Sequence, residues 1–102
     1  MQFLALEGDT PMGTVRLVYP PASATFKLGR LAVRKQGRGK GTAQKLIAAL
    51  EGAAKEMGAT EVYSGSQVPV RPLYEKAGYQ VVDDEGYLDE GQPHVMMIKT
   101  LT

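Results

Sequence analysis

A glycine-rich, basic segment leads directly into the strongest helical pattern of this chain, and this junction constrains the fold more than any other feature. Apolar residues recur at the spacing of one helical face: Ala43, Leu46, Ile47, Leu50, Ala53, Ala54 and Met57. Gly58 follows, where a left-handed cap ends a helix. Before the glycines, the mostly apolar run from Ala24 to Val33 indicates a strand. The sequence therefore predicts a strand, a loop and a helix in direct succession.

A second strand is expected beyond that helix, at Thr60 to Ser64. A strand, a helix and a strand in this order form a crossover unit, which makes the two strands parallel and the connection right-handed. The sheet is therefore expected to be mixed rather than purely antiparallel.

The rest of the chain predicts further strands and one short helix. Phe3 to Glu7 and Thr14 to Tyr19 read as a hairpin around the turn residues Gly8 to Gly13. A short helix over Val70 to Lys76 is expected to end at Gly78, and strands are expected near Tyr79 to Tyr87 and His94 to Leu101. We therefore expect one α+β domain over residues 1–102, with a mixed, largely antiparallel sheet.

Composition excludes several kinds of site. The 102 residues contain no cysteine and one histidine, so disulfides, thiolate metal sites and a cysteine nucleophile are excluded and no metal site is expected. Twelve basic residues against eleven acidic ones give a net charge of +1, so neither nucleic acid nor a membrane is an expected partner. No apolar run is long enough to span a membrane, and Met1 to Val18 lacks signal-peptide features, so we expect a cytoplasmic protein.

The segment from Leu31 to Thr42 favours an anion. Its alternating glycines let the backbone approach a ligand closely, and the helix that follows offers unpaired N–H groups and positive charge at its N-terminus. Arg38 and Lys40, between these glycines, would add side-chain charge, and pyrophosphate is the natural ligand. The segment fits neither the P-loop nor the dinucleotide-binding spacing, because Gly41 separates Lys40 from Thr42 and the third glycine comes one position early.

This segment resembles a known family. Gln36-Gly37-Arg38-Gly39-Lys40-Gly41, after a strand that ends Leu31-Ala32-Val33, is similar to the Q/R-x-x-G-x-G/A signature of the GNAT superfamily of N-acetyltransferases. Farther along, Leu73-Tyr74-Glu75-Lys76-Ala77-Gly78-Tyr79 resembles the tyrosine-containing helix end of that superfamily. The resemblance extends from about Gly8 to Leu101. It implies a fold in which two parallel strands splay apart to admit the pantetheine arm of acetyl-CoA.

The resemblance also implies roles for individual residues. The loop backbone would hold the cofactor pyrophosphate, the Val33 amide would polarise the acetyl carbonyl, and Tyr74 would protonate the departing thiolate in a direct transfer to a small-molecule or peptide amine. Gln67 stands where an asparagine that contacts the cofactor is common. The implied cofactor contacts are Leu31, Ala32, Val33, Gln36, Gly37, Arg38, Gly39, Lys40, Gly41, Thr42, Gln67 and Tyr74.

The residue that removes a proton from the acceptor amine is less defined. Its candidates lie near the predicted C-terminal strands: Asp83, Asp84, Glu85, Asp89, Glu90 and His94. Glu85 is preferred because it lies between strands expected to face the open end of the cofactor site. Lys27 and Arg30, on the predicted third strand, either line the acceptor cleft or face solvent.

Two rival functions and one departure from the family pattern stay open. The chain could bind coenzyme A without turnover, or it could be a domain that binds anions or nucleic acid. Most family members carry a strand and one or two helices before the segment that Phe3 resembles. Because such elements usually build one wall of the acceptor site, three consequences stay open: another subunit supplies the wall, a large substrate binds across an open cleft, or activity is lost. An exposed sheet edge and apolar surface favour a homodimer.

Overall fold

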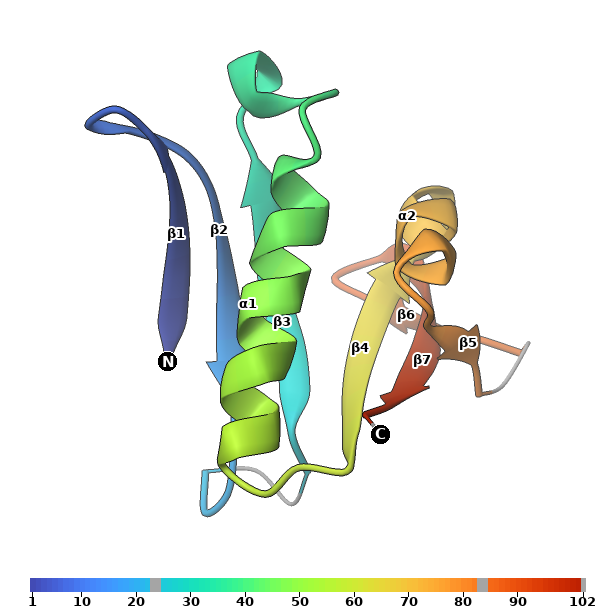
Figure 1. The fold of residues 1–102 in the computed structure, drawn as a ribbon. Coiled ribbons are helices and arrows are strands. Elements are labelled where there is room, and N and C mark those ends of the chain that lie inside the picture. The colour runs from blue at the N-terminus through green and yellow to red at the C-terminus, as the bar shows by residue number, and fades with distance from the viewer. Residues whose placement is uncertain (23–24, 83–84, 102) are drawn as a thin grey trace.

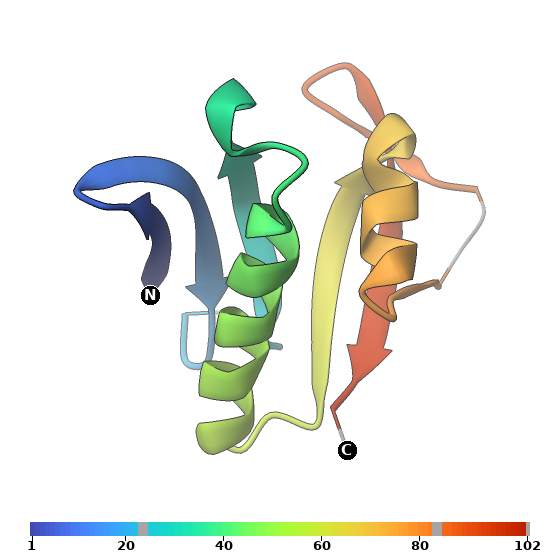
Figure 2. The same cartoon turned by 45° about the horizontal axis from the view of Figure 1, so that its top comes forward.

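The computed structural model describes residues 1–22, 25–82 and 85–101, and within these ranges seven strands form one sheet with two α-helices on the same face (Figures 1 and 2). The strands are β1 (Gln2–Glu7), β2 (Thr10–Val18), β3 (Lys27–Val33), β4 (Glu61–Gln67), β5 (Gln80–Val81), β6 (Tyr87–Asp89) and β7 (Gln92–Thr100). The helices are α1 (Thr42–Glu56) and α2 (Arg71–Lys76), with 3-10 turns η1 (Lys35–Gly37) and η2 (Val68–Val70) before them. None of the helices in these ranges has the length and apolar character needed to cross a membrane.

The sheet has the order β1-β2-β3-β4-β7-β5, with β6 paired to β7, and the described strands contain one parallel pair, β3 with β4. That pairing covers Lys27 with Tyr63 and Leu28 with Ser64, although β3 runs on to Val33 and β4 to Gln67. Past these pairs the two strands diverge (Figure 1). The predicted crossover, the mixed α+β sheet and the splayed parallel strands are therefore confirmed.

Helix α1 packs on strands β1, β2 and β3 through the apolar face seen in the sequence. Leu46, Ile47 and Leu50 are buried, and they pack in one cluster with strand residues such as Val15 and Leu17. The helix ends as predicted, because Gly58 adopts φ +94° and its N–H donates to the Lys55 carbonyl at 3.0 Å.

Two predicted boundaries are wrong near the N-terminus. The turn after β1 occupies Gly8 and Asp9 rather than residues 8–13, so β2 already begins at Thr10 and includes Pro11. A register shift next to Leu6 accommodates this proline in the sheet. The third strand begins at Lys27, and Ala24, where it was expected to begin, lies outside the described residues.

The single strand predicted near Tyr79 to Tyr87 is also wrong. The structure has the two-residue β5 and a separate β6, which forms a hairpin with β7. The hairpin turns at Glu90 and Gly91, which both have positive φ, a conformation that matches the twist of paired strands. Asp83 and Asp84 lie outside the described residues.

Candidate functional site

A groove of about 760 Å³ opens where β3 and β4 diverge. One part of its lining is the end of β3, from Leu31 to Val33. Other parts are the loop before α1 with the first helical turn, and one side of α2. Figure 2 shows α1 and α2 on the two sides of the opening between the strands. Residues far apart in the sequence therefore meet at this groove because the parallel pairing ends early.

The loop end of the groove is suited to an anion. Gly39 and Gly41 have φ +78° and +73°, and Gly41 is the N-cap of α1 with no side chain to cap the helix. The first turn of α1 contains no acidic residue. Arg38 and Lys76 also line the groove, and no described acidic residue does. The helix dipole and two cations therefore favour a phosphate here, and the residues present fit the pyrophosphate of a coenzyme.

The β3 edge of the groove has backbone groups that an extended ligand can pair with. The Arg34 N–H donates to the Met12 carbonyl of β2 at 2.7 Å. Successive N–H groups of a strand point to opposite edges, so the N–H groups of Val33 and Leu31 face the β4 side. Within the described residues, that edge has no strand partner beyond Leu28.

The predicted acid, Tyr74, is buried and is not among the residues that line the groove. Pro72, Leu73 and Lys76 line the groove, whereas Tyr74 is 5% exposed and packs edge-on against Tyr79 with ring centroids 5.8 Å apart. Burial raises the pKa of Tyr74 above its ordinary value, and the neighbouring Ser64 hydroxyl partly offsets the increase. The phenol therefore keeps its proton at neutral pH, beside the residue at which the β3 to β4 pairing ends.

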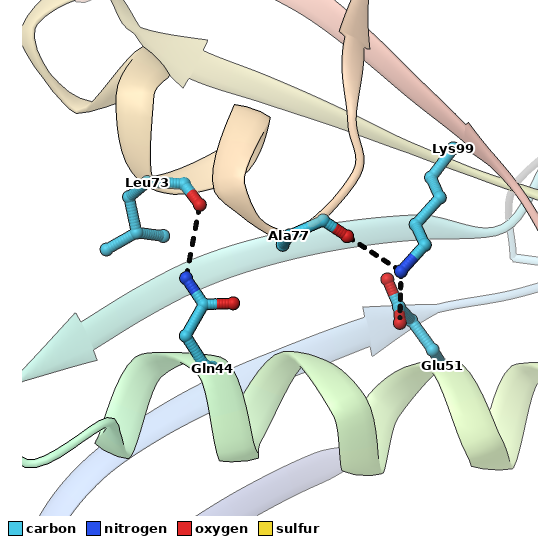
Figure 3. Close-up of polar contacts among 5 residues, drawn as sticks. All are labelled: Gln44, Glu51, Leu73, Ala77 and Lys99. Carbon is cyan, nitrogen blue, oxygen red and sulfur yellow. Dashed lines mark hydrogen bonds and ion pairs between the residues drawn. The ribbon is translucent and has the colours of Figure 1, made fainter.

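Polar contacts hold α2 at a fixed position across the groove from α1 (Figure 3). Gln44 of α1 donates through Nε2 to the Leu73 carbonyl at 3.2 Å. Lys99 of β7 places its Nζ 3.0 Å from Glu51 Oε1 and donates to the Ala77 carbonyl at 2.7 Å. Because Glu51 and Lys99 are partly buried, these contacts are screened less than surface pairs.

Tyr79 lies next to this ion pair. Its pKa is raised, first by burial and then by the negative charge of Glu51. The α2 region therefore contains two phenols whose neutral forms the folded state favours.

Several residues implied by the family resemblance lie outside the groove lining. Gln36, Lys40 and Gln67 do not line it, and the Lys40 ammonium pairs with Glu7 at 3.1 Å. Glu85 lines a separate hollow beside Tyr87 and His94, whose rings stack 5.6 Å apart. The structure thus brings together Leu31, Ala32, Val33, Arg38, Gly39, Gly41 and Thr42, but it does not bring Glu85 to them.

Sequence reasoning missed part of the lining: Ala43, Gln44, Val70, Pro72, Leu73 and Lys76. The Q/R-x-x-G-x-G/A spacing also fits Arg38, Gly41 and Ala43, two residues later than the match at Gln36. All three of these residues line the groove. The spacing alone does not separate the two registers, and the groove lining contains residues of both.

Comparisons with known proteins agree with this geometry. The family model described as "Acetyltransferase (GNAT) domain" matches residues 1–101. A Bacillus subtilis protein named "Uncharacterized N-acetyltransferase YjcF" is 34% identical over 93 residues, which cover 91% of this chain and 65% of the relative. Across four such curated relatives, the chain spans 60 to 65% of their length.

Solved structures share the fold. An acyl-CoA N-acyltransferase from Pseudomonas aeruginosa superimposes with a TM-score of 0.82 at 23% identity, covering 97% of this chain and 67% of that one. An aminoglycoside 6'-N-acetyltransferase complexed with coenzyme A gives a TM-score of 0.78 at 20% identity, covering 97% and 71%. At these identities the likeness shows a shared fold.

The raised tyrosine pKa values predict a loss of stability at alkaline pH. A group whose pKa is higher in the folded state contributes stability fully below its unfolded pKa, about 10 for tyrosine, and loses it as pH rises through the folded-state pKa. We expect the free energy of unfolding, measured by urea titration, to fall above about pH 10. Tyr79→Phe should show a shallower fall, with Tyr19→Phe as the control for removing a phenol. Equal slopes for the wild type and Tyr79→Phe would contradict this prediction.

Proposed function

Because the chain belongs to the GNAT acetyltransferase family, we propose that it binds acetyl-CoA in the groove between β3 and β4 and transfers the acetyl group directly to a primary amine. The observation that carries this proposal is the early end of the parallel pairing. It leaves the β3 edge next to the N-terminus of α1. The N-cap of that helix is Gly41, which has no side chain to cap it. One groove thus offers backbone groups for an extended chain and a positive end for phosphates.

In this proposal the backbone from Gly39 to Thr42 and the Arg38 guanidinium hold the pyrophosphate. The pantetheine arm pairs with the N–H groups of Leu31 and Val33 like an added strand. Lys40 can join the phosphates only by leaving Glu7, and an exposed ion pair of this kind contributes at most about 1 kcal/mol. The arrangement supports the contacts expected at Gln36 and Gln67 less directly, since neither residue lines the groove.

When bound, acetyl-CoA supplies a thioester whose acetyl carbon the amine nitrogen attacks, while the carbon–sulfur bond breaks and the coenzyme sulfur takes a proton. The Val33 N–H would donate to the acetyl oxygen, and the Leu31 N–H faces the same edge. Tyr74 would supply the proton to sulfur, because it stays neutral and lies by Ser64, where the opening between β3 and β4 closes. No residue has to form a covalent intermediate.

The group that accepts the amine proton is a separate question. Glu85 stays our candidate for this base, with transfer through water, because its hollow lies beside Tyr87. The Tyr87 hydroxyl lies against Gly65 of β4. Ser64 and Ser66, on either side of Gly65, are buried on the helix side of the sheet. Because successive residues of a strand alternate between its faces, position 65 lies on the face opposite the helices.

We further propose a cytoplasmic homodimer. Edge strand β1 exposes 59% of Leu4 and 58% of Leu6, which a second copy could cover. Acetyl-CoA carries several phosphate charges and does not cross a bilayer unaided, which favours the compartment where it is made. We expect twice the 11.0 kDa chain mass in light scattering, and a strict monomer would contradict the dimer.

Tyr74→Phe tests the proposed acid. The substitution keeps the ring and removes the proton donor, so we expect kcat for thiol release from acetyl-CoA with a panel of amines to fall about 10²- to 10⁴-fold. Coenzyme affinity should stay unchanged, and Tyr79→Phe is the control for a neighbouring buried phenol. Full activity in Tyr74→Phe would reject Tyr74 as the acid. Coenzyme binding by the wild type without turnover would favour the binding-only alternative.

Gly39→Asp and Gly39→Asn together test the anion site. Both residues tolerate a positive φ better than other side chains do, and no atom lies within 4 Å of a Cβ at Gly39, so the pair differs chiefly by one negative charge. We expect calorimetry to give about tenfold weaker coenzyme A binding for Gly39→Asp than for Gly39→Asn. Equal affinities would place the phosphates elsewhere. Salt-sensitive binding to DNA or RNA without coenzyme binding would favour the nucleic-acid alternative.

A further inference from the structure

A second hollow, of about 610 Å³, lies on the other side of the β3 end. Its walls are Met1 and residues of β1, β2 and β3, including Gln2, Thr14 and Arg16. It shares Leu31 and Ala32 with the groove proposed for acetyl-CoA. Two cavities therefore meet at the strand segment along which we place the thioester, and a molecule in the second hollow would reach that segment from the opposite side.

The charge of this hollow is one-sided. Arg16 and Arg30 are the ionisable side chains in its lining, and no described acidic residue lines it. Neither arginine has an ion-pair partner in the part of the chain that the structure describes. The ion pairs there join Lys40 with Glu7, Arg71 with Glu75 and Lys99 with Glu51. The arginine pocket, defined here by Arg16 and Arg30, therefore presents two guanidinium groups to whatever enters it.

A β-bulge positions one of these arginines. Thr14 pairs with Ala32 and Arg16 with Gly29, so Arg30 and Leu31 together oppose the single residue Val15. Arg30 has φ +54°, which is uncommon for any residue other than glycine. Bulges redirect side chains and recur next to active sites. Arg30 thus has an unfavourable backbone conformation and lines this pocket.

We propose that the arginine pocket binds the carboxylate of the acceptor, so that the substrate is an amino acid or a similar amine that carries an acid group. This inference rests on the proposed acetyl transfer. Guanidinium groups bind carboxylates through paired, charge-assisted hydrogen bonds, which would fix the acceptor at one end. The same positive charges lower the pKa of a nearby ammonium group, which favours the neutral amine that attacks the thioester. A polyamine would instead be repelled.

The test compares acceptors that differ by one charge. Acetyl transfer is measured with free amino acids, the matching amino acid amides and aminoalkylphosphonates, in the wild type, Arg16→Gln, Arg30→Asn and the control Lys45→Gln. Asparagine tolerates the positive φ at position 30, and Arg16, Arg30 and Lys45 are exposed, so thermal melting should show folded variants. We expect kcat/KM for the acids to fall about tenfold in both arginine variants, with the amides and the control unchanged.

Binding measurements separate this inference from the acetyltransferase proposal. N-acetyl amino acids and their amides are titrated into the wild type and both arginine variants, with and without coenzyme A. Arginine-dependent binding of the acids supports the pocket even if coenzyme A does not bind, a result that would reject only the proposed transfer. Transfer to amides as fast as to acids, or acid binding that both variants retain, would overturn the pocket while leaving the transferase intact. Preference for phosphonates over carboxylates would also overturn it.

Discussion

The parallel contact between β3 and β4 ends after two residue pairs, and the groove depends on that early end. Had the strands stayed paired to Val33 and Gln67, their backbone groups would satisfy each other and no extended ligand could enter. Instead, the β3 edge keeps N–H groups that face the opening. Gln44 and the pair of Glu51 with Lys99 hold α1 and α2 to each other, which keeps the groove walls at a fixed separation.

The two faces of the β3 end carry different chemistry. On the helix side, the N-terminus of α1 and two cations suit phosphates, and buried tyrosines keep their protons. On the other side, Arg16 and Arg30 suit an acid group of a second molecule. A nucleophile and an acyl donor that entered from opposite faces would meet at Leu31 and Ala32 without competing for space. This geometry favours direct transfer, because positioning replaces a covalent intermediate.

Much of the fold followed from local patterns, whereas the site followed only in part. The apolar spacing from Ala43 to Met57 fixed α1, and the order strand, helix, strand fixed the parallel pair. The strand near Tyr79 to Tyr87 was wrong because β5 and β6 both pair with β7, and such long-range pairing leaves little trace in a short segment. The loop glycines Gly39 and Gly41 were found, but the groove-facing side of α2 was not.

The sequence by itself determined that glycines and cations stand between a strand and a long helix, because periodicity and backbone freedom are local properties. It also pointed to the family and to Tyr74 as the candidate acid. Only the tertiary structure decided that Tyr74 is buried, that Glu85 lies in another hollow, and that Arg16 and Arg30 share a pocket. These facts depend on strand order, on a bulge and on where one pairing stops. Such features arise from packing between distant segments, so no single stretch of sequence contains them.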